Sequence, residues 1–154
     1  MNQPRLREVS IVDVTFGQEV TVVQPCNLYG CTLGDGVFVG PFVEIQRGVK
    51  VGARTRIQSH SFVCELVSIG ADCFIGHGVM FVNDTFSTGG PARGNTGLWK
   101  VTHIGDRVSI GSNATIMPVR VCDDVVIGAG AVVTHDIDVP GLYAGVPARF
   151  MRPA

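Results

Sequence analysis

A six-residue repeat runs through most of this chain and limits what it can fold into. Aliphatic or aromatic residues recur at every sixth position over nine successive repeats: Leu33, Val39, Ile45, Val51, Ile57, Val63, Ile69, Ile75 and Phe81. Neither the helical period of 3.6 residues nor the two-residue alternation of a long strand produces this spacing. We therefore interpret each repeat as a short strand followed by a turn, with three repeats forming one triangular coil.

Two further positions of each repeat are restricted. The residue after the aliphatic one is often glycine, as at Gly34, which we interpret as a permissive corner. The fourth residue after it is small or β-branched through Thr85, which predicts a second inward position. The repeat extends upstream to Phe16 and downstream to Val139, with two five-residue steps, and this predicts about five stacked coils.

Composition agrees with a chain made mostly of strands. Valine and isoleucine together number 35 residues against 6 leucines, and branching at Cβ favours extended backbone. The 154 residues, taken as one domain over 1–154, are enough for a sizeable core. The five cysteines are odd in number and form no Cys-x-x-Cys pair, so we expect neither a disulfide framework nor a zinc site.

Charge and hydropathy exclude several partners. The formal net charge of -1 leaves no basic surface for nucleic acid or an anionic membrane. The longest apolar run, 125–133, is far shorter than the roughly 20 residues that span a bilayer. The first seven residues lack the apolar stretch of a signal peptide, so we expect a cytoplasmic protein.

The pattern aliphatic-Gly-x-x-small-x is similar to that of the hexapeptide-repeat acyltransferases and covers nearly the whole chain. This resemblance implies an all-β, left-handed parallel β-helix, with N-terminal coils over 10–86 and C-terminal coils with a tail over 104–154. Between them the repeat fails, and residues 87–103 form an extruded loop. The family forms homotrimers with active sites between subunits, and the loop lies beside such a site.

Residues 18 positions apart are expected to stack on one edge of the prism, and Arg47, Glu65 and Asn83 form such a column. This column is either a solvated ridge or part of a site. The segment 74–84 resembles enzymes that acetylate the 3-amino group of UDP- or dTDP-linked sugars. That resemblance implies catalytic roles for Asn83 and Glu65 near the sugar amine, with Arg47 and Asp84 as substrate contacts.

His77 follows the same corner rule as Asn83 but occupies a different edge of its coil. Family members that acetylate hydroxyls need a histidine base, so His77 is a third catalytic candidate. An amine needs less help because its neutral form is already nucleophilic. We interpret His60 and His103 as polar surface or loop residues.

The downstream coils resemble the coenzyme A platform of the family. Small residues there let a pantetheine arm lie close to the main chain, and arginines suit its phosphates. The corner at Pro118 is one residue shorter than the family pattern. The implied coenzyme A contacts are Trp99, Gly111, Ala129, Thr134, His135, Arg149 and Arg152. Acetyl-CoA is the expected cosubstrate, and no metal is expected.

The leading hypothesis is therefore an N-acetyltransferase acting on a nucleotide-linked amino sugar. One alternative is an O-acetyltransferase that uses His77 as base on a sugar, serine or small alcohol. A β-helix carbonic anhydrase is disfavoured because the four histidines include no closely spaced pair. The non-enzymatic alternative is a structural β-helix module that binds no coenzyme A.

Overall fold

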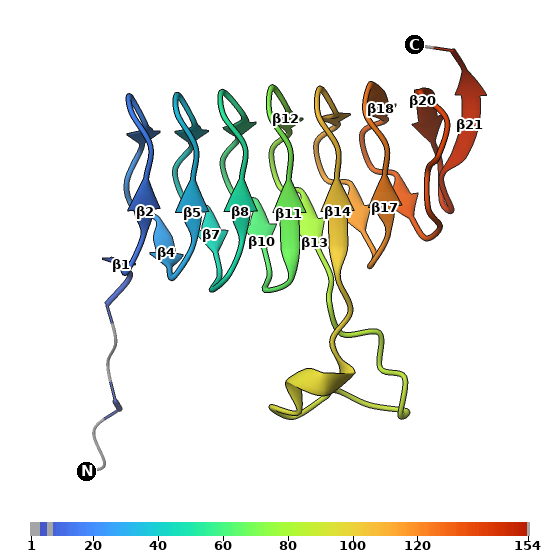
Figure 1. Cartoon of the computed structure of the whole chain (residues 1–154). Helices are drawn as coiled ribbons and strands as arrows, with labels where there is room; N and C mark the ends of the chain where they lie inside the picture. The colour runs from blue at the N-terminus through green and yellow to red at the C-terminus, as the bar shows by residue number, and fades with distance from the viewer. Residues whose placement is uncertain (1–3, 6–7, 154) are drawn as a thin grey trace.

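The computed structural model describes residues 4–5 and 8–153. Most of the first seven residues, on which the expectation about a signal peptide is based, therefore lie outside the described residues. From residue 11 the chain winds into a three-sided prism of short strands, with one loop extruded from its side (Figure 1). The predicted parallel β-helix is confirmed, because strands of successive coils pair in parallel on all three faces.

Each face of the prism is one sheet. Sheet A contains β1 (Ile11–Val12), β4 (Asn27–Tyr29), β7 (Glu44–Ile45), β10 (Phe62–Val63), β13 (Met80–Phe81), β16 (Thr115–Ile116) and β19 (Val132–Val133). Sheet B contains β2 (Thr15–Phe16), β5 (Thr32–Leu33), β8 (Lys50–Val51), β11 (Val67–Ile69), β14 (Thr102–Ile104) and β17 (Arg120–Val121). Sheet C contains β3 (Thr21–Val22), β6 (Phe38–Val39), β9 (Arg56–Ile57), β12 (Phe74–Ile75), β15 (Ser109–Ile110), β18 (Val125–Ile127), β20 (Gly141–Ala144) and β21 (Arg149–Arg152).

The prism has about seven coils, so the prediction of about five was too low. Sheet A alone stacks 7 strands. The first coil, with β1, and the last, with β19 and β20, also wind around the axis. The final strand β21 pairs antiparallel with β20 and ends the solenoid.

The repeat positions fill the core as predicted. All nine residues from Leu33 to Phe81 are at most 3% exposed. At the N-terminal end Phe16 is 44% exposed because no earlier coil covers it. At the other end Val139 is 58% exposed, and Ile137, at 4%, takes the inward place through a bridge to Val121.

The glycines after the aliphatic positions have a different role from the predicted one. Gly52 does not have a positive φ, but a Cβ there would lie 2.5 Å from the Gly70 carbonyl carbon of the next coil. The left-handed conformation falls two residues later in the corner, at positions such as Arg54 and Asp72 with φ of 60° and 56°. The glycine after the aliphatic position therefore permits close stacking of coils, and the left-handed position two residues later takes either glycine, as at Gly36 and Gly78, or another residue type.

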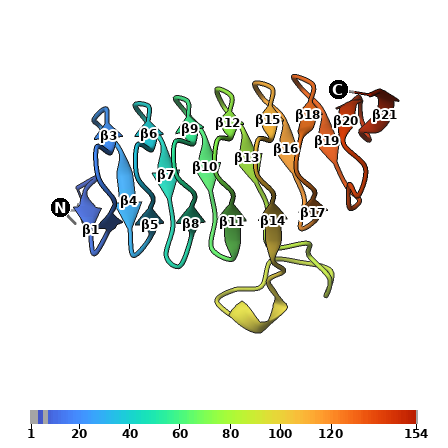
Figure 2. The ribbon, with the colours of Figure 1, turned by 45° about the horizontal axis from the view of Figure 1, so that its top comes forward.

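The extruded segment occupies residues 82–101 between β13 and β14, so it begins and ends earlier than the predicted 87–103. It contains one 3-10 turn, η1 (Thr96–Leu98), and extends away from the prism in both views (Figure 2). Its neck is closed by Lys100, whose N–H donates to the Asn83 carbonyl oxygen at 2.8 Å. Thr85 is consequently exposed in the loop, and Thr102 fills the inward position predicted for it.

No helix within residues 4–5 and 8–153 has the length and apolar character needed to cross a membrane. Four cysteines lie buried in the core and Cys122 is half-buried, all as free thiols. Burial raises the pKa of the Cys31 thiol to about 11 and that of Cys64 to about 12, so both remain protonated at neutral pH.

Candidate active site

The corner between sheets A and B, which we call the A/B edge, carries the predicted column. Asn83 stacks on Glu65, one coil earlier, and its side-chain Nδ2 donates to the Glu65 carbonyl oxygen at 3.1 Å. Arg47 belongs to the coil before that and passes over Gly30, where a Cβ would lie 3.1 Å from the Arg47 Cγ. The prediction that these side chains share one edge is confirmed.

The amide of Asn83 has a defined orientation. A carbonyl oxygen only accepts hydrogen bonds, so Nδ2 must face Glu65, and Oδ1 points away from that contact. The main chain of Asn83 is also held, through its carbonyl oxygen, by Lys100 at the loop neck. Asn83 therefore presents a hydrogen-bond acceptor at the point where the loop leaves the prism.

The Asp84 carboxylate accepts hydrogen bonds from the main chain of the loop. Its Oδ1 accepts the Phe86 N–H at 3.0 Å, and its Oδ2 accepts the Ala92 N–H at 2.7 Å. Ala92 is 7% exposed, so the carboxylate ties the beginning of the loop to its one buried residue. Both carboxylate oxygens of this predicted substrate contact are thus occupied within the loop.

Sequence reasoning missed a polar network on sheet A beside this column. The Glu44 carboxylate accepts hydrogen bonds from Asn27 Nδ2 at 3.2 Å, Gln46 Nε2 at 2.9 Å and the Tyr29 hydroxyl at 3.5 Å. Burial and the carboxylates of Glu44 and Glu65 raise the pKa of Tyr29, so its hydroxyl stays protonated and donates. Stacking of successive coils also pairs Asn27 with Glu44, 17 residues apart because this coil contains a five-residue step, and this is the signal that could have revealed the network.

His77 lies on the edge between sheets C and A, as predicted, and not on the A/B edge. It is exposed, and its Nδ1 is 2.8 Å from the Ser59 hydroxyl of the preceding coil. Gly111 and Ala129 follow it along the same edge. A Cβ at Gly111 would collide with the Ala129 main chain, so coil stacking alone explains this glycine.

The other predicted coenzyme A contacts are divided among three places. Thr134 and His135 lie on the A/B edge beyond Asn83, with the Thr134 hydroxyl 2.8 Å from the His135 Nδ1. Arg149 and Arg152 lie on β21 at the end of sheet C, where each donates only to a nearby carbonyl oxygen. Trp99 lies in the loop, where its main-chain N–H donates to the Thr96 carbonyl oxygen at 3.1 Å.

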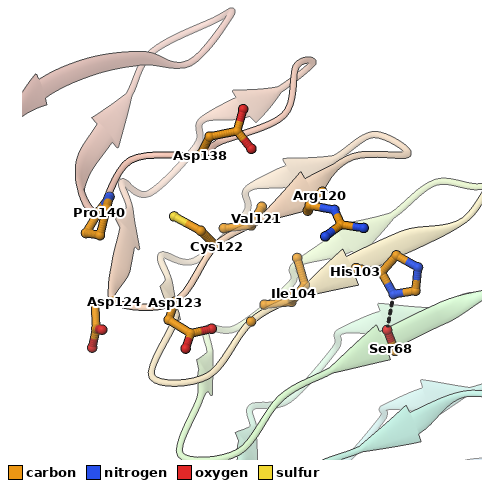
Figure 3. Close-up of a pocket in the computed structure, with 11 residues that line it drawn as sticks. Ser68, His103, Ile104, Arg120, Val121, Cys122, Asp123, Asp124, Asp138 and Pro140 are labelled. Carbon is orange, nitrogen blue, oxygen red and sulfur yellow. Dashed lines mark hydrogen bonds between the residues drawn. The ribbon is translucent and has the colours of Figure 1, made fainter.

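A further groove lies elsewhere, on the outer face of sheet B near β17 (Figure 3). It encloses about 630 Å³, and its lining includes Ser68, His103, Arg120, Asp123 and Asp138. The Ser68 hydroxyl lies 2.6 Å from the His103 Nδ1, and the Arg120 side chain lies beside this pair. None of the predicted site residues lines this groove, and its carboxylates outnumber its one arginine, so it is poorly suited to phosphate.

The third edge, between sheets B and C, is held by ion pairs. Arg54 contacts Asp72 at 2.6 Å, and Arg107 contacts Asp124 at 2.7 Å. Hydrogen bonds from these arginines lower the pKa of both carboxyls from the ordinary value of 3.8. Within residues 4–5 and 8–153 no group of three or more His, Cys, Asp or Glu side chains is placed to hold a metal ion.

Sequence comparison agrees with this architecture. Residues 30–65 match the bacterial transferase hexapeptide family (six repeats), and residues 101–135 match the hexapeptide repeat of succinyl-transferase. Together with the repeat and the β-helix, these matches show that the chain belongs to the hexapeptide-repeat family.

Individual relatives extend the comparison. A bifunctional protein GlmU from Paramagnetospirillum magneticum is 31% identical over 150 residues, which cover 85% of this chain and 30% of the relative. The chain thus spans about a third of the length of such curated relatives.

Two solved structures share the fold. A galactoside acetyltransferase in complex with coenzyme A superposes with a TM-score of 0.67 at 28% identity, covering 79% of this chain and 64% of the other. A mutant perosamine N-acetyltransferase from Caulobacter crescentus, in complex with CoA and GDP-perosamine, gives 0.67 at 23% identity, covering 90% and 57%.

Proposed function

We propose that this protein is an acetyl-CoA-dependent N-acetyltransferase whose acceptor is the amino group, in particular a 3-amino group, of a UDP- or dTDP-linked sugar. The observation that carries the proposal is the fixed amide of Asn83 on the A/B edge: its Nδ2 donates to the Glu65 carbonyl oxygen, which leaves Oδ1 as a hydrogen-bond acceptor away from that contact. Such an oxygen matches an amine, which donates N–H bonds.

The reaction follows from these groups. The neutral amine, oriented by Asn83 and by the Glu65 carboxylate, attacks the thioester carbonyl carbon. A C–N bond forms, the C–S bond breaks, and the amine proton passes to the leaving thiolate or to water. Positioning of the two substrates supplies most of the acceleration, because the neutral amine needs no strong protein base.

The A/B edge supports a binding place for the cosubstrate. Between Asn83 and Thr134 this edge carries only the shortened corner at Met117 and Pro118, both half-buried. Arg149 and Arg152 are exposed on β21, where their guanidinium groups could meet phosphates. The two superposed transferases contain coenzyme A, which is consistent with this assignment.

The faces of the prism support assembly as a homotrimer. Outward residues on sheets A and C include apolar side chains, namely Phe62, Met80 and Val132 on A and Phe38, Phe74 and Val126 on C. Those on sheet B are polar, namely Thr32, Lys50, Ser68, His103 and Arg120. A contact between sheet A of one subunit and sheet C of the next, repeated by rotation, closes into a ring. It would leave the A/B edge and the loop at the seam between subunits.

We expect the trimer to act in the cytoplasm, where buried thiols stay reduced.

The test is thiol release from acetyl-CoA with a panel of acceptors. The panel contains UDP-, dTDP- and GDP-linked 3-amino and 4-amino sugars, simple amino sugars, and hydroxyl acceptors including serine. Fast release with a nucleotide-linked amino sugar supports the proposal and identifies the acceptor. Release only with hydroxyl acceptors would replace it with O-acetylation. No release, together with no binding of coenzyme A in calorimetry, would favour a non-catalytic module.

O-acetylation with His77 as base is the second candidate. The contact between the Ser59 hydroxyl and the His77 Nδ1 leaves the other ring nitrogen of this exposed residue available. A base role predicts that His77→Gln abolishes transfer, whereas the amine mechanism predicts a small effect.

A further inference from the structure

Gln46 connects the Glu44 network to the column that holds Asn83. Its Nε2 donates to the Glu44 carboxylate at 2.9 Å, and its Oε1 accepts the Glu65 N–H at 3.3 Å. The carbonyl oxygen of Glu65 accepts a hydrogen bond from the Asn83 Nδ2 at 3.1 Å. The main chain of Glu65 is therefore held between two side-chain amides, one from the coil before it and one from the coil after it.

The donors and acceptors along these hydrogen bonds allow only one orientation of the Gln46 amide. A carboxylate only accepts, so the amide of Gln46 must turn its Nε2 toward Glu44 and its Oε1 toward the Glu65 N–H. Rotating that amide by half a turn would break both bonds. Asn27 and Tyr29 hold the carboxylate of Glu44 from the preceding coil, so the chain begins from a side chain that is itself anchored.

Asn83 needs such support because of its place in the fold. It lies at the neck of the extruded segment, which returns to its carbonyl oxygen through Lys100. Beyond β13 it has no strand partner of its own. Among the described residues, its side chain is hydrogen-bonded to the prism through Glu65.

We propose that Gln46, anchored by Glu44, is a positioning residue for Asn83: it sets the Glu65 main chain, and through it the direction in which the Asn83 Oδ1 faces the acceptor. The expected effect of Gln46 on catalysis rests on the proposed function. The orientation of the Asn83 amide does not depend on that function and can be tested separately.

The test first adds a carboxylate at position 46 and then exchanges the side chains of Glu44 and Gln46. Gln46→Glu keeps an oxygen for the Glu65 N–H but places a second carboxylate against Glu44. We expect kcat to fall about 10-fold, with KM for acetyl-CoA unchanged and with little change in melting temperature. The double variant Glu44→Gln, Gln46→Glu restores one donor and one acceptor between the two side chains, so it should recover most of kcat.

Gln58 provides the matched control, because it occupies the same repeat position after Ile57 on another edge. Gln58→Glu should leave kcat unchanged. The inference is overturned if Gln46→Glu leaves kcat unchanged, or if the double variant shows no recovery.

A second readout separates this inference from the proposed function. The side-chain amide resonance of Asn83, identified by its absence in Asn83→Asp, should shift in Gln46→Glu and return in the double variant. This holds even if no acceptor is ever acetylated. A resonance that does not move overturns the positioning role, whatever the activity of the protein.

Discussion

Asn83 and Glu65 are stacked in successive coils and joined by a hydrogen bond of 3.1 Å from the Asn83 Nδ2 to the Glu65 carbonyl oxygen. One of the two Nδ2 hydrogens is used in this bond, and Oδ1, the acceptor, lies at the other end of the amide. One contact between a side chain and the main chain thus fixes which way round the amide of Asn83 lies.

Replacing Asn83 should therefore affect turnover more than folding. We expect Asn83→Ala to lower kcat/KM for the amine acceptor by roughly 100-fold, because the nucleophile loses its orienting contact. Asn83→Asp should also be impaired, since a carboxylate oxygen cannot donate to the Glu65 carbonyl. Thiol release and melting temperature measure the two effects, and a proportional loss of both would refute a role in catalysis.

The loop should be dispensable for folding but needed for activity. Replacing residues 85–99 by a short glycine-serine linker keeps the bond between Lys100 and Asn83 at the neck. The loop contributes only Ala92 as a buried residue, so we expect the melting temperature to fall by less than about 5 °C while transfer is lost. A variant that fails to fold would show that the loop is structural.

Trp99 offers a direct measurement of cosubstrate binding because it is the only tryptophan of the chain. If it contacts coenzyme A, adding the cosubstrate should change its fluorescence, and Trp99→Ala should raise KM for acetyl-CoA about 3- to 10-fold. Phe86→Ala, at a 60% exposed position of the same loop, is the control and should leave KM unchanged. Constant fluorescence at saturating acetyl-CoA would remove Trp99 from the binding site.

Substitution by valine should change the free energy of unfolding differently at two buried threonines. The Thr55 hydroxyl donates to the Gly70 carbonyl oxygen at 2.8 Å and accepts the Cys73 N–H at 3.0 Å. Thr55→Val should therefore cost about 1–3 kcal/mol of the free energy of unfolding. Among the described residues the Thr102 hydroxyl oxygen is buried without a partner, so Thr102→Val should be neutral or stabilise by about 1 kcal/mol. Urea denaturation of both variants checks the contrast, and equal destabilisation would contradict it.

The ion pairs between sheets B and C predict an acid-dependent loss of stability. Arg54 lowers the pKa of Asp72 below 3.8, so this carboxyl contributes stability above that pH and loses it as the pH falls through its folded value. The urea midpoints of wild type and Asp72→Asn should differ at about pH 6 and converge toward about pH 3. Added salt should also reduce the difference, because the pair is exposed. A difference that grows on acidification would refute this assignment.

Much of the fold could be predicted because the repeat is local. The inward residues from Leu33 to Phe81 follow from a spacing that every coil reproduces. The errors fall where the repetition ends: at Phe16, which no earlier coil covers, and at Val139, where Ile137 faces inward instead.

The candidate site could be predicted only in part. Stacking at 18 residues found the edge that carries Glu65 and Asn83, but it did not assign Asp84 to the loop. It also passed over Gln46, whose importance lies in the two groups that it joins and not in its place in the repeat.

The sequence by itself thus determined the coil period, the inward residues and the edge on which the column lies, because these depend on distances along the chain. The tertiary structure alone decided that Thr102 fills the inward place left by Thr85, and that the Asn83 Nδ2 donates to the Glu65 carbonyl oxygen. Those outcomes depend on where the loop rejoins the prism and on which donor meets which acceptor across coils. Hydrogen-bond partners are chosen by geometry between coils, which the six-residue repeat leaves open.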